Sequence, residues 1–485
     1  MAKDVKKAEY SSPEGSHKWE YLCALFCAIS TACVGSVQGW NSPSLVEFGA
    51  PDSRISLSVD DASTLSAAPS VGHALSPIFS VLTVDRIGRR NSLLLSMVPM
   101  TVSWGLILIA EHVTVLIAAR ALAGFASGLI LYSIPMYKGE ILSTNLRGPL
   151  STVGGITYNF GNVFMFAVAP YLGVRITAGV CMAVAICLLI SFWVIPESPY
   201  FLVMVNKVDQ AEAALEKLRG KPDVSDELEM IKTTVREKGK TLAKVKKNSS
   251  EEKTSSEVNP NKWSDAFVRL FTVRGNVKAF SIVIIFNLMQ LFSGLGKFVT
   301  YGHIMFGDMR SPITPGISTT MFVVLQSICG VVGLGTVTRY GRRQLVIISG
   351  VLSGICLCII ASYFYLLEHM KIDVTGFSVI PFCTVYIFVV VQTVGLGVVQ
   401  GVIVTEIFAT DIKALAICII SVFGSTMSIF TIKYYLVVVK SWGLGHSIPF
   451  FFFMISIWLG TALLSRLLPE TKGKTLLEIQ RTLND

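Results

Sequence analysis

The chain has 485 residues, of which 52% are hydrophobic and only 15% are charged, and its mean hydropathy is +0.61. This composition excludes a soluble globular protein and indicates that a bilayer is its solvent. The formal net charge of +9 predicts no nucleic-acid partner, because the basic residues lie between hydrophobic runs, where they orient membrane spans.

Twelve hydrophobic runs are long enough to cross a membrane, which takes about 20 residues per helix. The first eighteen residues contain no apolar core and no small-residue cleavage site, so we expect no removable signal peptide. The runs lie near 20–40, 62–84, 91–110, 113–136, 149–172, 175–195, 277–303, 315–337, 344–367, 377–406, 412–439 and 446–467. They predict an all-α membrane protein with twelve transmembrane helices in two six-helix, pseudo-symmetric halves.

The distribution of basic residues predicts the orientation of these spans. If both termini are cytoplasmic, about 33 of the 41 Lys and Arg residues lie on the cytoplasmic side, as the positive-inside rule requires. The low-complexity stretch at 246–260 belongs to the cytoplasmic linker. The predicted parts are a cytoplasmic tail (1–18), a first half (19–196), a linker with short amphipathic helices (197–276), a second half (277–468) and a cytoplasmic tail (469–485).

Motifs for enzyme chemistry are not found outside the spans. The sequence has no nucleotide-binding loop and no nucleophile–base set, and its ten cysteines all fall in hydrophobic runs without a metal-binding CxxC pattern. We therefore expect neither an enzyme nor a metal site, and no cofactor.

Three sequence marks occur in the same order in each half. A basic turn at 85–90 (DRIGRR) returns at 339–343 (RYGRR), and Glu140 precedes Arg147 by the same interval at which Glu406 precedes Lys413. The third mark is PESP after span six and PETKG after span twelve. Two repeated halves with charged clusters on one membrane face are typical of a transporter whose site lies between the halves near the midplane.

These marks resemble the signatures of the sugar porters of the major facilitator superfamily. The stretches PESPYFL (196–202), EIFATDIK (406–413) and TIK (431–433) are most similar to insect facilitated trehalose or glucose transporters. The resemblance implies a monomeric, multi-pass protein of the plasma membrane with a cytoplasmic gate of salt bridges. Thr338 departs from the pattern, because an acidic residue usually stands there. The implied gate residues are Arg89, Arg90, Glu140, Arg147, Glu197, Arg342, Glu406, Lys413 and Glu470.

A site for a sugar needs neutral amides and hydroxyls around an aqueous cavity. Span seven reads MQLFSGLGKFVTY at 289–301, where Gln290 and Ser293 match the family pattern, and Gln326 of span eight matches another amide ligand. The candidate substrate-binding residues are Gln290, Gln326, Ser293, Asn159 and Thr393.

Several ligands that the resemblance implies are missing. Gly296 and Gly424 replace asparagines, Gly401 replaces a tryptophan, and the prolines usual in span ten are absent. Losing these side chains predicts weak binding of ordinary hexoses. A changed solute, a weakened transporter and a transporter-derived sensor all fit these departures.

The remaining unusual residues concern coupling and charge. Asn41 replaces the carboxylate of proton-driven relatives, which favours facilitated diffusion. Arg120 is either the usual partner of that carboxylate or an anchor at the outer membrane interface. His73 is better explained by helix packing than by proton transfer. Lys297 fits snorkelling to the outer surface or a cation in the cavity that favours an anionic solute.

The function that these features predict is facilitative uniport of a sugar, either trehalose or a hexose, by alternating access. The alternatives are a transport-weak or inactive homologue acting as a nutrient sensor, or a porter for a non-hexose polar or anionic solute. The partners expected are a small sugar or related polar solute and membrane lipids.

Overall fold

The structure is a computed structural model that describes residues 16–236, 262–408 and 412–472, with 474, 478, 479, 482 and 483 near the C-terminus. Most of the predicted tail at 1–18, the stretch at 246–260 and part of the tail at 469–485 therefore lie outside the described residues.

The first half is built from helices α1 to α6. α1 and α2 form one broken span, and α6 is a continuous run of 48 residues that is interrupted by the non-helical backbone of Gly173, where φ is 74°. Since this run is about twice the length that crosses a bilayer, it supplies spans five and six. The helices are α1 (Lys18–Gly39), α2 (Asn41–Phe48), α3 (Val59–Ile87), α4 (Arg89–Ile109), α5 (Val113–Ile141) and α6 (Thr144–Ser191).

The second half repeats this arrangement in six spans. Span seven is broken into α11 and α12, and span ten into α15 and α16 with a π-helical turn, η2, between them. The elements are α11 (Arg274–Leu291), α12 (Leu295–Asp308), α13 (Pro315–Arg339), α14 (Arg342–Glu368), α15 (Val379–Gln392), η2 (Thr393–Gly397), α16 (Val398–Glu406), α17 (Lys413–Leu436), η3 (Val437–Ser441) and α18 (Ser447–Leu467), with the short 3₁₀ helix η1 (Thr375–Phe377) before α15.

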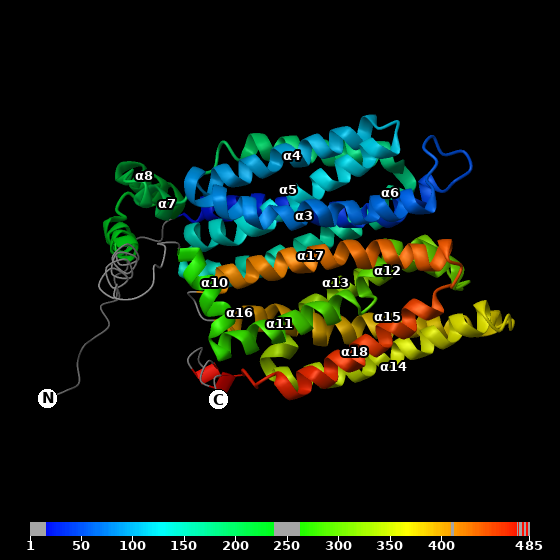
Figure 1. Ribbon diagram of the computed structural model, residues 1–485. Helices are drawn as coiled ribbons and strands as arrows, with labels where there is room; N and C mark the ends of the chain where they lie inside the picture. Colours follow the sequence, from blue (N-terminus) through cyan, green and yellow to red (C-terminus); the bar gives the residue numbers. More distant parts are fainter. Residues whose placement is uncertain are drawn as a thin grey trace.

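Ten helical segments of the described chain are long and apolar enough to cross a membrane. One of the ten is the double-length α6 segment, and the 29-residue α3, which is more polar and not among them, lies beside α17 along the bundle (Figure 1). The total is therefore twelve spans, as predicted.

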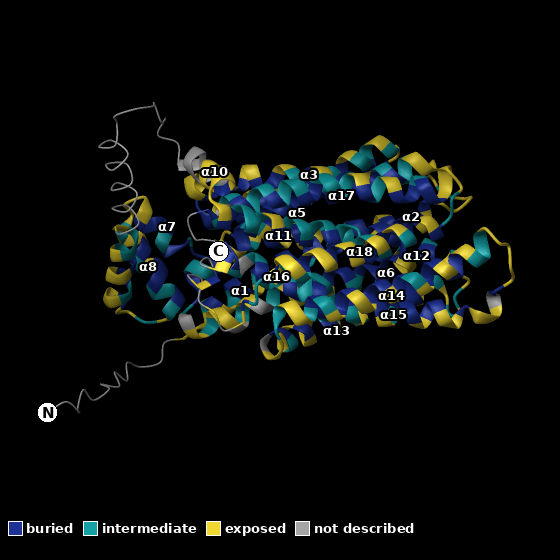
Figure 2. Cartoon of the chain, turned by 60° about the horizontal axis from the view of Figure 1, so that its bottom comes forward, coloured by how far each residue is buried: buried dark blue, intermediate teal, exposed yellow. Residues whose placement is uncertain are grey.

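Large apolar side chains cover the outside of this bundle. Figure 2 shows buried residues between the helices and exposed ones on outward faces such as those of α14 and α18. Ile348 and Ile355 of α14 and Ile455 and Leu459 of α18 are all exposed. Apolar side chains on the surface suit contact with lipid chains.

Short helices lie at one end of the bundle, outside the spans. They are α7 (Pro199–Met204) and α8 (Val208–Arg219) after span six, and α10 (Lys262–Thr272) before span seven (Figure 1). Arg219 at the end of α8 lies 2.7 Å from the fully buried Glu20 of α1 and 2.6 Å from Glu227. These ion pairs attach the segment after span six to the first half.

The break in span seven positions one wall of the interior. Gly294 has φ of 83°, a conformation that favours glycine, and a Cβ at this position would lie 2.9 Å from the ring of Phe453. The Ser293 hydroxyl donates to the carbonyl of Gln290 and accepts from the backbone N–H of Leu295, so it satisfies backbone groups that the break leaves without helical partners. Broken helices at membrane depth occur where they line a cavity.

Candidate functional site

A cavity of about 540 Å³ lies between the two halves. Its wall is formed mainly by amides, hydroxyls and apolar side chains from α1, α3, α5 and α6 on one side and from α11, α12, α13, α16 and α17 on the other. A cavity of this size and lining suits a small polar solute. The polar side chains in its wall are Gln38, Ser70, His73, Ser127, Tyr158, Asn159, Asn162, Asn287, Gln290, Gln326, Gln400, Ser421, Ser425 and Ser428.

Three of the five candidate substrate-binding residues line this cavity. Gln290, Gln326 and Asn159 come from α11, α13 and α6 and therefore from both halves. Ser293 and Thr393 are not part of the wall that the described residues form. Ser293 is fully buried in the break of span seven, and the Thr393 hydroxyl is buried at the start of η2.

The side chain of Gln290 is held by a residue that the sequence analysis missed. The Nε2 of Gln392, which is fully buried at the end of α15, donates to the Oε1 of Gln290 at 2.8 Å. This bond leaves the Gln290 Nε2 group available as a donor in the cavity wall. Gln392 precedes the π-helical turn η2, and such turns are frequent at functional sites. Its signal was an amide at the end of the otherwise apolar run of α15.

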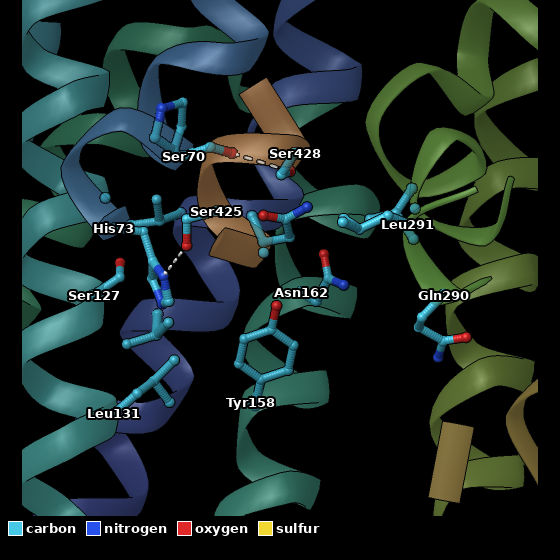
Figure 3. Close-up of a pocket in the computed structure, with 18 of the residues that line it drawn as sticks. Ser70, His73, Ser127, Leu131, Tyr158, Asn162, Gln290, Leu291, Ser425 and Ser428 are labelled. Atoms are coloured by element: carbon cyan, nitrogen blue, oxygen red, sulfur yellow. Dashed lines mark hydrogen bonds between the residues drawn. The ribbon is translucent and has the colours of Figure 1, made fainter. Parts of the chain in front are cut away.

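Residues of α3 and α17 meet in one wall of the cavity, and Figure 3 shows their two hydrogen bonds. Ser70 Oγ donates to Ser428 Oγ at 3.2 Å, and His73 Nδ1 lies 3.0 Å from Ser425 Oγ. His73 therefore faces the cavity and the opposite half, which the interpretation as a helix-packing residue did not anticipate.

The glycines that replace larger residues of the family pattern have different amounts of space around them. A Cβ added at Gly296 or Gly401 would meet nothing within 4 Å, whereas one at Gly424 would lie 2.8 Å from Asn287 Oδ1. Gly296 and Gly424 line the cavity. The wall is therefore open at position 296 and already filled by Asn287 beside position 424.

Lys297 neither snorkels to the surface nor lines the cavity. It is 3% exposed, and its Nζ donates to Thr431 Oγ1 at 3.0 Å and to the Leu291 carbonyl at 3.4 Å. The carbonyl belongs to the last turn of α11, where helical partners end. Lys297 thus joins the break of span seven to α17.

Arg120 of α5 makes a comparable contact in the first half. It is buried, its Nη1 donates to the Val37 carbonyl at 2.8 Å, and its guanidinium lies 4.7 Å from the centre of the Trp40 ring. Val37 lies in the last turn of α1, and Trp40 is the residue between α1 and α2. A buried base therefore satisfies a carbonyl at the broken first helix of each half.

The predicted gate residues form two equivalent clusters at one end of the bundle. In the first half, Arg89 Nε lies 2.9 Å from Glu140, which also accepts a hydrogen bond from the Ser198 hydroxyl. Arg89 also pairs with Asp85 at 3.2 Å.

In the second half, Arg342 lies 3.0 Å from Glu406, which accepts from the Thr471 hydroxyl at 2.8 Å. The side chain of Thr338, which takes the place of Asp85, lies outside the described residues, and threonine supplies no carboxylate. Each of these pairs joins residues of a single half.

Glu197 and Glu470 receive backbone N–H groups at helix starts. Glu197 accepts from the N–H of Arg89 at 3.0 Å and of Arg90 at 2.9 Å, at the start of α4. Glu470 accepts from the N–H of Arg342 at 3.0 Å and of Arg343 at 3.3 Å, at the start of α14. Both carboxylates therefore satisfy first-turn donors and complement the helix dipole.

The other predicted gate residues have local contacts. Arg147 donates to the Leu142 carbonyl at 3.2 Å, and Lys413 begins α17 at the same end of the bundle. The role of all nine residues in gating stays a prediction.

Two pseudo-symmetric six-span halves around a polar cavity define a membrane transporter with the major facilitator fold. A family model described as "Sugar (and other) transporter" matches residues 31–483, and the chain belongs to this family. Its members are transporters, so the prediction that the chain is not an enzyme is confirmed.

Curated relatives agree with this assignment. The chain is 26% identical over 464 residues to the facilitated trehalose transporter Tret1 of Apis mellifera ligustica, covering 95% of this chain and 88% of that protein. It is also 26% identical to Tret1 of Drosophila grimshawi, of which it spans only 47%.

Solved structures show the same fold. The inward open conformation of the xylose transporter XylE from E. coli has a TM-score of 0.73 at 19% identity, covering 96% of this chain and all of that one. The major facilitator proton:xylose symporter XylE bound to 6-bromo-6-deoxy-D-glucose has a TM-score of 0.66 at 19% identity, covering 96% and 99%. The predicted resemblance to sugar porters and the predicted fold class are confirmed.

Proposed function

We propose that this protein carries a neutral, hydroxyl-rich solute of the sugar class across the plasma membrane by facilitated diffusion. The observation that carries the proposal is the cavity between the halves, whose polar lining consists of amides, hydroxyls and His73. Such groups match the hydroxyls of a sugar, and the named relatives favour trehalose or glucose.

Contacts between the halves support alternating access. They include Lys433 of α17, which lies 3.1 Å from Asp60 at the start of α3. Asn41 of α2 also donates to the Thr300 carbonyl of α12 at 3.2 Å. Both contacts lie at the end of the bundle opposite the charged clusters. We therefore assign this conformation to the state that is closed at the end opposite the clusters.

The position of Lys297 bears on whether the solute is neutral or anionic. Because its amine is directed to Thr431 and the Leu291 carbonyl, it offers the cavity no cation. This arrangement favours the neutral sugar over the anionic solute.

Uptake by the purified chain in proteoliposomes tests the proposal. Labelled trehalose or glucose should enter until the two sides are equal, because Asn41 bonds to Ser66 and Thr300 and supplies no carboxylate for proton transfer. Accumulation driven by an imposed pH gradient would contradict the uncoupled mechanism. Absence of uptake across a panel of trehalose, hexoses and polyols would favour the sensor alternative.

A further inference from the structure

Two spans carry polar side chains that are not among the predicted substrate-binding residues. They are Ser66, Ser70 and His73 on α3 and Ser421, Ser425 and Ser428 on α17. Intervals of three and four residues place each set on one helix face. The two helices belong to different halves and lie side by side (Figure 1).

The two polar faces are hydrogen-bonded to each other. Ser70 bonds to Ser428, and His73, one turn later in α3, bonds to Ser425, one turn earlier in α17. All four residues also line the cavity. The seam that holds the halves together is therefore at the same time a wall of the solute site (Figure 3).

The seam continues away from the cavity with a charged contact. Lys433 Nζ lies 3.1 Å from Asp60 Oδ1 and 3.1 Å from Thr64 Oγ1. Since the Asp60 side chain is 73% exposed and that of Lys433 is 43% exposed, solvent screens this pair and it contributes little by itself. The uncharged bonds beside the cavity are the part of the seam that a solute can reach.

We propose that His73 and Ser425 bind the solute, and that a solute hydroxyl competes with the bond between them that closes the halves. This proposal deepens the proposed function and rests on it. A ring nitrogen and a serine hydroxyl can each pair with a sugar hydroxyl. Exchanging their mutual bond for bonds to solute changes the relative stability of the closed and open states, which a ligand must do to shift their populations.

The test compares variants of the seam with a matched control on the same helix. Ser425→Ala and His73→Leu remove the bond between the halves. Thr426→Val removes a neighbouring hydroxyl that, among the described residues, donates to the Val422 carbonyl within α17. The reporter is a cysteine introduced by Ser66→Cys, because Ser66 is 5% exposed and accepts from Asn41 at 3.0 Å. The full chain in nanodiscs is treated with a hydrophilic maleimide, and labelling is followed by peptide mass spectrometry to separate it from the ten native cysteines.

We expect Ser425→Ala and His73→Leu to raise the labelling rate about three- to tenfold, as loss of a neutral hydrogen bond allows, and Thr426→Val to leave it unchanged. Trehalose or glucose should change labelling in the wild-type seam and much less in the two variants. Equal labelling rates in all variants would contradict the proposal that the bond between His73 and Ser425 closes the halves. If no sugar changes wild-type labelling, the solute contact is wrong. A sugar-dependent change without uptake in proteoliposomes would instead contradict the transport proposal alone.

Discussion

At the residue scale, Gln392 sets the orientation of the cavity amide Gln290. The buried Nε2 of Gln392 donates a hydrogen bond to the Oε1 of Gln290. Gln392→Leu should therefore free the Gln290 side chain to turn. Losing one neutral hydrogen bond costs about 0.5–1.5 kcal/mol, which corresponds to a rise of up to about tenfold in the half-saturating sugar concentration. Uptake kinetics measure this change.

The control is the adjacent Thr393→Val, which should change little because Thr393 is not part of the cavity wall that the structure describes. The double variant Gln290→Ala with Gln392→Leu should be no weaker than Gln290→Ala alone, since both act through one amide. A large effect of Thr393→Val would instead support its prediction as a ligand.

Gly296 offers a place to add an amide to the site. Because a Cβ there meets nothing within 4 Å, Gly296→Asn should strengthen glucose binding by about 0.5–1.5 kcal/mol. Gly424→Asn should fail to do so, because its Cβ would press on Asn287 at 2.8 Å. Titration calorimetry on the purified protein compares the two. Tight glucose binding by the unmodified chain that is unaffected by Gln290→Ala would show that the site is elsewhere.

At the scale of elements, span seven depends on a buried amine. Lys297 is 3% exposed, and Thr431 is its nearer acceptor at 3.0 Å. Thr431→Val should therefore destabilise the protein by about 1.5–3 kcal/mol, the usual contribution of a hydrogen bond to a charged group. Thermal unfolding in detergent measures the loss. Adding Lys297→Met to that variant should recover most of it, and no recovery would show that the amine is stabilised elsewhere.

The start of α14 depends on the carboxylate of Glu470. Burial by itself raises the pKa of this carboxyl, but N–H donors of Lys472, Arg342 and Arg343 hold the pKa below its usual 4.5. Because the pKa is lowered on folding, the stabilisation is present above 4.5 and is lost as pH falls through the folded-state pKa.

Glu470→Gln should therefore lower stability by about 0.5–2 kcal/mol at pH 7, and by less at a pH below the folded-state pKa. Denaturation midpoints at the two pH values measure the difference. Lys474→Gln is a control, since a lysine ammonium cannot accept a hydrogen bond from the N–H groups of a helix start. A loss that is the same at both pH values would contradict the ionised cap.

At the scale of the whole molecule, the charged clusters join helices within each half. We predict that they control access to the cavity from their end. Glu406→Arg places like charges beside Arg342, now 3.0 Å from Glu406, and should shift accessibility towards the state open at the cluster end. Cysteine labelling from both sides of the membrane measures the shift.

The double variant Arg342→Glu with Glu406→Arg restores opposite charges and should return labelling towards that of the wild type. Arg147→Glu, which removes the donor to the Leu142 carbonyl, should act in the same direction as Glu406→Arg. Unchanged labelling in each single variant would remove these residues from the gate.

The sequence by itself determined the membrane class, the number of spans and the paired clusters. These follow from apolar run length and from marks repeated in each half, such as Glu140 and Glu406, because the bilayer imposes helix length and each mark is local in the chain. Gln290 and Gln326 were also predicted from the resemblance to the family pattern, and Asn159 was a further candidate amide; the structure places all three in the cavity wall.

Only the tertiary structure decided which polar residues meet. The spacing of Ser421, Ser425 and Ser428 shows a polar helix face, but not that it lies against His73, which is more than 340 residues away in the chain. In the same way, the direction of the Lys297 amine depends on the packing of α17 beside the end of α11, which no local pattern encodes. Contacts between helices depend on how whole faces pack, and that packing is a property of the folded bundle.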